Sequence, residues 1–281
     1  MSFENSALLV KLQIGKWTGK KDDKAAEREI ASAHQVQGSF GEVKKDLVSR
    51  VALKSITEAE SAIRTFHAKH TQPWSPGVAI LPSAIYFEYV RGLAALKENY
   101  QYAVEAFVNN YSVLKSDSKL RLGDKYDDDD YPSADNLKSR FYVQTDFIPL
   151  ASSSGIVLDL ASEDLKKVQD EYSKTLSEME RSSVSASYSA LGGAITNLLE
   201  RLLDPTTARL NTMDKVKETA QLVRKMNVMK SDALDAVCAD ILATVCICSM
   251  EDIKQDTLLQ QTVMDAATEV KKKIDLVKPQ Q

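Results

Sequence analysis

The feature that most limits how this chain can fold is a long helical pattern between residues 162 and 203. Two sets of apolar residues recur there at steps of three and four, which draws a single stripe along a helix. The first set is Leu165, Val168, Tyr172, Leu176 and Met179, and the second is Leu191, Ile195, Leu198 and Leu202. We predict an N-cap at Ser162, favourable carboxylates at Glu163 and Asp164, and a stop at Pro205. An unbroken helix would measure about 63 Å at about 1.5 Å per residue.

The middle of this helix, residues 182–194, consists almost entirely of Ser, Ala and Gly. These small side chains would let another helix approach closely, and Ser and Gly also weaken a helix by propensity. Since an amphipathic helix of this length cannot leave its apolar stripe in water, we expect it to pack against a partner along its length.

Three further helices are predicted downstream, over residues 206–229, from a cap at Ser231, and over a last segment with Leu259, Val263, Ala266, Val270, Ile274 and Val277 on one face. Upstream, helices are predicted over 22–34, from about 41 to 69 with Val51 on the inner face, and over 84–114. The chain has only ten Gly and seven Pro, which favours helices over a turn-rich β-sandwich.

Alternating or aromatic-rich runs at residues 8–14, 140–150 and 156–160 predict three strands of a small antiparallel sheet. The segment 71–82, with its three prolines, is expected to be a loop. The expected fold class is therefore α+β, mainly α, with long helices. We divide it into a mixed α/β part over 1–160 and a helical part over 161–281.

The composition of the chain disfavours several classes of protein. The net charge of −4 gives no global electrostatic case for nucleic acid. The three cysteines, Cys238, Cys246 and Cys248, crowd into one apolar segment, which favours a reducing compartment over a disulfide framework. The first residues lack the pattern of a signal peptide, and no apolar run approaches membrane-spanning length. We therefore expect a cytoplasmic protein.

A basic turn with an aromatic residue is one candidate site. It contains Lys16, Trp17, Lys20 and Lys21. An exposed tryptophan among lysines would stack a base and contact phosphates of single-stranded nucleic acid. The alternative is that Trp17 covers the edge of the small sheet while the lysines stay in water.

A run of four carboxylates, Asp127, Asp128, Asp129 and Asp130, is the other candidate. It lacks the alternating spacing and terminal Glu of an EF-hand loop, so a calcium site is disfavoured. A solvated loop, or an acidic contact for a basic partner, fits the pattern better.

Recognisable catalytic or cofactor chemistry is missing from the sequence. There is no phosphate-binding glycine loop, nucleophile elbow or zinc-binding HExxH pair. His67 and His70 lie three apart at a predicted helix end but have no ligand partner at a recognisable spacing. Cys246 and Cys248 form C-x-C rather than C-x-x-C. We therefore predict no enzyme activity, no catalytic residues, no metal site and no cofactor.

Several motifs together resemble an uncharacterised family of phage and plasmid proteins. They are Trp17-Thr18-Gly19-Lys20-Lys21-Asp22, Pro73-Trp74 leading to Ile80-Leu81-Pro82, and Tyr131-Pro132 followed by Phe141 and Phe147-Ile148-Pro149. The resemblance covers roughly residues 8–165. Members of that family are often encoded near MoxR-type AAA ATPases and von Willebrand A-domain proteins. The resemblance implies a phage or mobile-element protein in the host cytoplasm, and it supplies no catalytic residues.

The sequence therefore yields two functional hypotheses. The first is a non-catalytic protein that self-assembles, or binds a partner such as an AAA ATPase, through helical surfaces. The second is a single-stranded nucleic-acid-binding protein that uses the basic turn around Trp17.

Overall fold

The computed structural model describes residues 6–38, 41–152, 155–156, 158–159, 161–204 and 208–277. By its internal contacts the chain forms two compact units that alternate along the sequence. Unit 1 comprises Met1–Lys11, His70–Tyr89 and Asp146–Gln281, and unit 2 comprises Leu12–Lys69 and Val90–Thr145. The predicted boundary near residue 160 stays a prediction.

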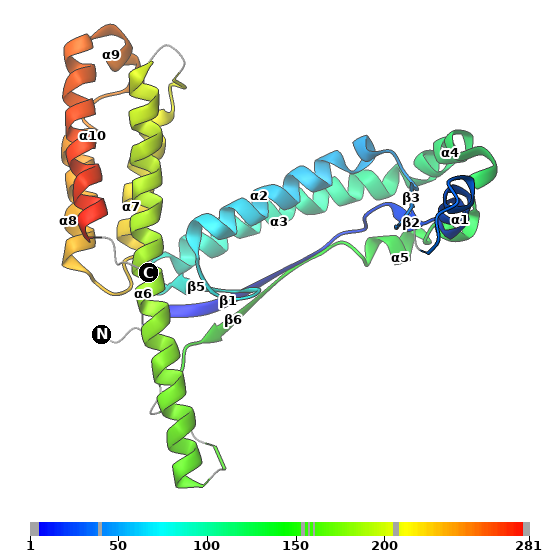
Figure 1. The fold of residues 1–281 in the computed structure, drawn as a ribbon, viewed down its shortest axis with the longest axis horizontal. Coiled ribbons are helices and arrows are strands. Elements are labelled where there is room, and N and C mark those ends of the chain that lie inside the picture. Colours follow the sequence, from blue (N-terminus) through cyan, green and yellow to red (C-terminus); the bar gives the residue numbers. More distant parts are fainter. Residues whose placement is uncertain are drawn as a thin grey trace. The chain divides into compact units, whose positions relative to one another are not determined.

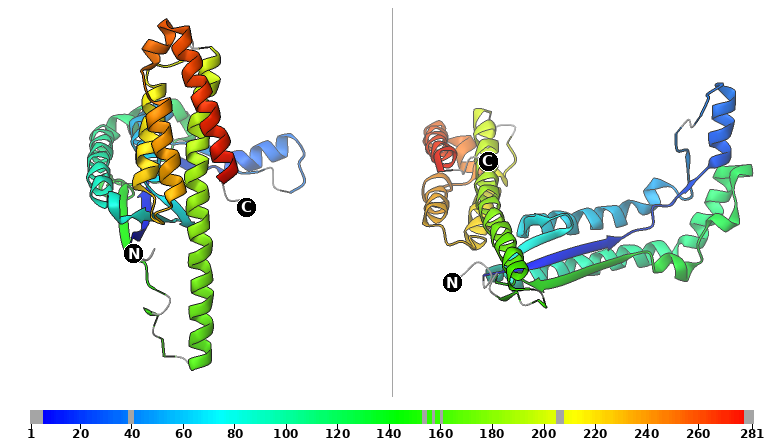
Figure 2. Two further views of the ribbon diagram at one scale, coloured as in Figure 1. Left: turned by 90° about the vertical axis from the view of Figure 1, so that its left-hand side faces the viewer. Right: turned by 60° about the horizontal axis from the view of Figure 1, so that its bottom comes forward.

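The mainly helical α+β class is confirmed. Unit 1 holds a helical bundle built on α6 (Ser162–Leu203), with α7 (Thr212–Lys225), α8 (Asp232–Asp240), α9 (Met250–Gln255) and α10 (Thr257–Val277). Figure 1 and the left view of Figure 2 show α7, α8 and α10 beside the C-terminal half of α6. The second half of the predicted stripe lies inside this bundle, with Leu191, Ile195, Leu198 and Leu202 all buried.

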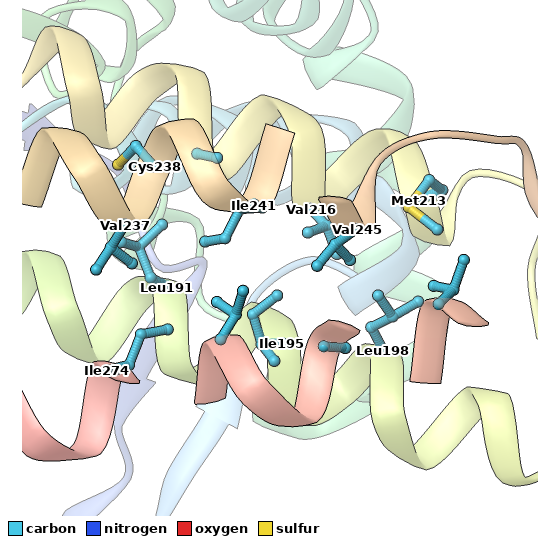
Figure 3. Close-up of a cluster of buried hydrophobic side chains, with 14 of the residues drawn as sticks. Leu191, Ile195, Leu198, Met213, Val216, Val237, Cys238, Ile241, Val245 and Ile274 are labelled. Carbon is cyan, nitrogen blue, oxygen red and sulfur yellow. The ribbon is translucent and has the colours of Figure 1, made fainter. Parts of the chain in front are cut away.

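The bundle core joins side chains from every long helix of unit 1. Leu191, Ile195 and Leu198 of α6 converge with Val237 of α8 and Ile274 of α10 (Figure 3). Between α8 and the next loop the chain makes a π turn over Ile241–Val245. Burial of about 1.5–3 kcal/mol per large apolar side chain makes this core the main stabilising element of the bundle.

The first half of α6 is covered much less. Of its apolar stripe only Leu176 is buried, where it packs with Ala7, Ile80, Leu150 and Val228. Leu165 is half-buried and Val168 is exposed. The expectation that the long helix needs a partner along its length is therefore met by the chain itself over the bundle, and only partly at the N-terminal end.

The start of α6 differs by one position from the prediction. Ala161 is the N-cap residue, it makes no side-chain cap hydrogen bond, and Ser162 is already helical. Pro205 lies outside the described residues, and α6 ends at Leu203. Ser231, by contrast, caps α8 as predicted, accepting a hydrogen bond from the Leu234 backbone N–H.

The sheet has four strands in the order β4-β5-β1-β6. β1 (Ala7–Gly15) and β6 (Tyr142–Pro149) confirm two predicted strands, whereas β4 (Gln72–Ser75) and β5 (Val78–Pro82) lie in the segment expected to be a loop. β1 pairs antiparallel with β5, with Leu9 opposite Ile80. Proline is tolerated here because Pro73 lies in an edge strand and Pro82 ends its strand.

The third predicted strand, 156–160, is wrong for the residues described. Residues 156, 158 and 159 lie outside any strand, and residues 157 and 160 are outside the described part of the chain. Of the apolar residues described in this run, Ile156 is half-buried and Leu158 is exposed.

Unit 2 contains α2 (Lys54–His70) up to Lys69, α3 (Tyr86–Asn109) from Val90, and α4 (Tyr111–Leu122). α2 and α3 approach closely at Gly92, where a Cβ atom would lie 2.5 Å from the Phe66 ring. Smaller elements are α1 (Lys24–Ala33), α5 (Ala134–Lys138) and a two-stranded sheet of β2 (Lys20–Asp22) and β3 (Lys44–Asp46). The predicted helix from about residue 41 therefore begins only at Arg50, with a short 3₁₀ turn, Arg50–Leu53, leading into α2.

Candidate partner-binding groove

Trp17 lies in the core of unit 2 and not on its surface. Its side chain is only 5% exposed. Its ring centroid lies 6.1 Å from that of Phe107 and 6.0 Å from that of Tyr111, the latter edge-on. Trp17 therefore presents no exposed face for base stacking, and its ring contacts are with aromatic residues of α3 and α4.

Lys16 is engaged by an acid of α2. Its Nζ lies 2.6 Å from a carboxylate oxygen of Glu60, whose other oxygen accepts a hydrogen bond from Arg64 at 2.8 Å. Burial alone would raise the pKa of Glu60, but Lys16 and Arg64 outweigh it and the pKa is lowered. Lys16 is thus paired with an acid of its own unit.

Lys21 is engaged by the aspartate run. The Asp130 carboxylate lies 3.3 Å from Lys21 Nζ and 2.5 Å from Lys45 Nζ, and its side chain is only 9% exposed. Burial would raise the pKa of Asp130, but the hydrogen bonds and charges of Lys45 and Lys21 lower it overall. Lys45 also donates to the Lys125 backbone carbonyl at 3.0 Å. Asp130 therefore ties the β2–β3 sheet to the segment after α4.

Two of the other aspartates also serve the fold of unit 2. Asp127 accepts a hydrogen bond from the backbone N–H of Asp129. Asp128 accepts from Lys115 at 2.9 Å and from the Tyr126 hydroxyl at 2.8 Å. Asp129 is exposed. The two sites predicted separately are thus joined by one ion pair, Lys21–Asp130.

A groove of about 610 Å³ lies beside the basic turn. It is lined by Lys16, Thr18, Lys20, Arg50, Val51, Leu53, Lys54, Thr57 and Glu58. Val51 is 79% exposed, although Leu53 two residues on is buried. The groove therefore combines an open apolar surface with a margin of cationic side chains.

Most cations at this margin are balanced. Lys16 pairs with Glu60, Arg50 lies 3.5 Å from Asp46, and Lys54 lies 3.8 Å from Glu58. Lys20 forms no ion pair within the part of the chain that the structure describes. A carboxylate on an incoming ligand would thus find Lys20 ready to pair, next to apolar surface.

Val51 was predicted to lie on the inner face of a helix, and that prediction is wrong. The predicted helix starts near residue 41, but residues 44–46 form β3 and the helical turn starts only at Arg50, so the face assigned to Val51 does not apply. An apolar residue in the exposed first turn before α2 carries no sequence signal that separates it from core residues.

The metal and thiol candidates occupy ordinary structural positions. His70 is buried, and burial followed by the charge of Arg64 lowers the pKa of His67. Cys238 is buried in the bundle core, and Cys246 and Cys248 are partly buried beside it. Within the described residues, no group of three or more His, Cys, Asp or Glu side chains could hold a metal ion. No helix there is long and apolar enough to cross a membrane.

Comparison with family models, with curated proteins and with solved structures gave no match to this chain.

Proposed function

We propose that this protein is non-catalytic and acts by binding another protein through the groove around Val51. The observation that carries the proposal is the exposure of Val51 at 79% in a groove of about 610 Å³ with cationic margins. Exposure of one apolar side chain would not mark a site, but an apolar groove rimmed by charged side chains is the kind of surface at which proteins interact.

The chemistry of the groove limits what it binds. An apolar side chain of the partner would cover Val51, and a carboxylate beside it would pair with Lys20. Because Lys16, Arg50 and Lys54 already have acidic neighbours, a highly charged polyanion would gain little from them. We therefore expect a partner segment with mixed apolar and acidic side chains.

The resemblance to phage and plasmid proteins indicates which partners to test first. A second copy of this chain and a MoxR-type AAA ATPase from the same replicon are the two candidates. Both would meet the protein in the host cytoplasm, which is the location that we propose.

Light scattering during size-exclusion chromatography tests self-association across the micromolar range, and titration with the purified ATPase tests the second partner. We expect association with one of them, weakened by Val51→Asp and by Lys20→Glu. Val113→Asp is the matched control, because Val113 is an exposed valine on α4 of the same unit and does not line the groove. A wild-type protein that stays monomeric and does not bind the ATPase would contradict the proposal. So would an equal loss of association in Val51→Asp and Val113→Asp.

Single-stranded nucleic-acid binding remains the alternative, with less support. Trp17 is buried, Lys16 and Lys21 face carboxylates, and of the four predicted residues only Lys20 keeps an unpaired charge among the described residues. If this site did bind single-stranded DNA, the affinity would fall steeply with salt and Lys20→Ala would weaken it. Absence of binding at about 50 mM salt would remove the alternative.

A further inference from the structure

In a second cavity, which lies in unit 1, all of the charged lining residues are basic. It has a volume of about 360 Å³ and lies between the C-terminal part of α6 and the start of α7. It is lined by Asn197, Arg201, Arg209, Thr212 and Lys215. Three of these five side chains are basic, and none of the five is acidic.

Three lysines of α10 are paired with acids. Lys271 pairs with Asp275, Lys272 with Glu269 and Lys273 with Asp240, at 2.6–2.7 Å. Arg201, Arg209 and Lys215 form no ion pair with any residue that the structure describes. Like charges that line one cavity repel one another, so this arrangement does not by itself stabilise the fold.

The cavity residues lie next to side chains that are packed in the bundle core. Directly around them in the chain, Leu198, Leu202, Met213 and Val216 are buried in the core. Two hydrogen bonds hold the segment between α6 and α7. Lys254 donates to the backbone carbonyl of Ala208 at 2.8 Å, and the Thr212 hydroxyl donates to the backbone carbonyl of Arg209 at 2.7 Å. The segment carrying Arg209 is thus held in place, which limits the ordering cost of binding a ligand.

We propose that this cavity binds a small, multiply charged phosphate compound. The planar guanidinium groups of Arg201 and Arg209 suit bidentate contacts to phosphate oxygens, and Lys215 adds a point charge. The Asn197 amide donates further hydrogen bonds to the same kind of acceptor. The volume exceeds the needs of a single phosphate group and lies within the range of small-molecule sites, about 300–1,000 Å³. This points to a pyrophosphate group, free or as part of a nucleotide.

Calorimetric titration with sodium pyrophosphate at constant ionic strength tests the proposal, followed by titration with a nucleoside diphosphate. We expect one site per chain, and a loss of affinity of about tenfold or more in each of Arg201→Gln and Arg209→Gln. The matched control is Lys217→Gln, which removes an exposed cation from the same helix, α7, outside the cavity. A nucleoside diphosphate that binds more tightly than pyrophosphate would identify the nucleotide as the ligand class, and equal affinity would identify the free diphosphate group.

Thermal unfolding gives an independent readout. Pyrophosphate should raise the melting temperature of the wild type more than sodium chloride of equal ionic strength, and Arg201→Gln with Arg209→Gln should abolish that difference. Without ligand, the double variant should melt no lower than the wild type, because a repulsion has been removed. Equal protection by both salts, unchanged binding in the arginine variants, or binding of single-stranded DNA without pyrophosphate would overturn the proposal. None of these outcomes affects the Val51 groove, which belongs to the other unit.

Discussion

The ammonium nitrogen of Lys45 lies 2.5 Å from a carboxylate oxygen of Asp130. This contact joins β3 to the aspartate run, two segments that are far apart in the sequence. With Lys21 on the other carboxylate oxygen, it turns a conspicuous acidic run and part of a conspicuous basic turn into one internal ion cluster. One residue of the acidic run and one of the basic turn, which look like parts of separate binding sites in the sequence, thus form an ion pair with each other.

Replacing the central carboxylate should destabilise unit 2. Asp130→Asn leaves Lys45 and Lys21 without their shared counter-charge in a nearly buried position, and we expect a loss of about 1–3 kcal/mol in the free energy of unfolding. Urea unfolding measures this loss. The control is Asp129→Asn, an exposed neighbour that should change stability by less than about 0.5 kcal/mol. Equal stability of the two variants would show that the cluster does not hold the unit together.

The same carboxylate predicts a pH dependence. The pKa of Asp130 in the folded protein lies below its ordinary value. Its contribution to stability is therefore complete above the unfolded pKa of about 3.9 and is lost as the pH falls through the folded pKa. Unfolding measured between neutral pH and pH 3 should show a shallower acid loss in Asp130→Asn than in the wild type. Parallel pH profiles would contradict this assignment.

A second internal contact explains the small residues in the middle of α6. Gln72 of β4 is only 4% exposed, and its amide nitrogen donates to the Ser187 hydroxyl at 3.1 Å. The Ser183 hydroxyl donates in turn to the Gln72 amide oxygen. Large side chains at positions 183 and 187 would block the approach of the strand. At Ser183 and Ser187 the neighbour is therefore a strand of the same chain, and not the helix that the small residues led us to expect.

This hydrogen-bonded cluster should show energetic coupling. Gln72→Leu leaves the buried Ser183 hydroxyl without its acceptor, and Ser183→Ala leaves the amide oxygen without its donor, so each should cost about 1–3 kcal/mol. The double variant should cost less than the sum, because both single changes break the same bond. A double-mutant cycle by urea unfolding measures the coupling. Strict additivity would mean that the two residues do not share a hydrogen bond in solution.

Two glycines should respond to alanine with opposite signs. Gly193 lies inside α6 with nothing near its potential Cβ, so Gly193→Ala should stabilise the protein by about 0.5–1 kcal/mol through helix propensity. Gly19 has a φ of +67°, and a Cβ there would lie 2.9 Å from Val48 Cγ2, so Gly19→Ala should destabilise it by about 1–3 kcal/mol. Thermal unfolding of the two variants distinguishes these outcomes. A stabilised Gly19→Ala would show that the turn after Trp17 tolerates other conformations.

The sequence predicts where the helices of this protein lie better than it predicts which residues are exposed. Periodicity locates α6, α8 and α10, because a buried stripe needs a fixed spacing whatever it packs against. It fails at β4 and β5, where prolines suggest a loop and only the edge position of Pro73 explains the strand. It also fails at Val51, because exposure depends on where the helix starts. Neither the groove nor the cavity with Arg209 could be predicted, since each joins residues whose proximity is decided by tertiary packing.

The three thiols should react in an order set by their burial. Burial, with a smaller effect of Asp235, raises the pKa of Cys238 to about 12, and burial raises the pKa of Cys246 to about 11. Burial also raises the pKa of Cys248, which is only partly buried. Because the thiolate is the reactive form, we expect slow labelling at pH 8 in the native protein, with Cys248 first and Cys238 only on unfolding of the bundle. Mass spectrometry of the protein after timed alkylation, with a urea-unfolded sample as reference, reads out the order. Rapid native labelling of Cys238 would mean that the α6–α8–α10 core opens far more readily than its packing indicates.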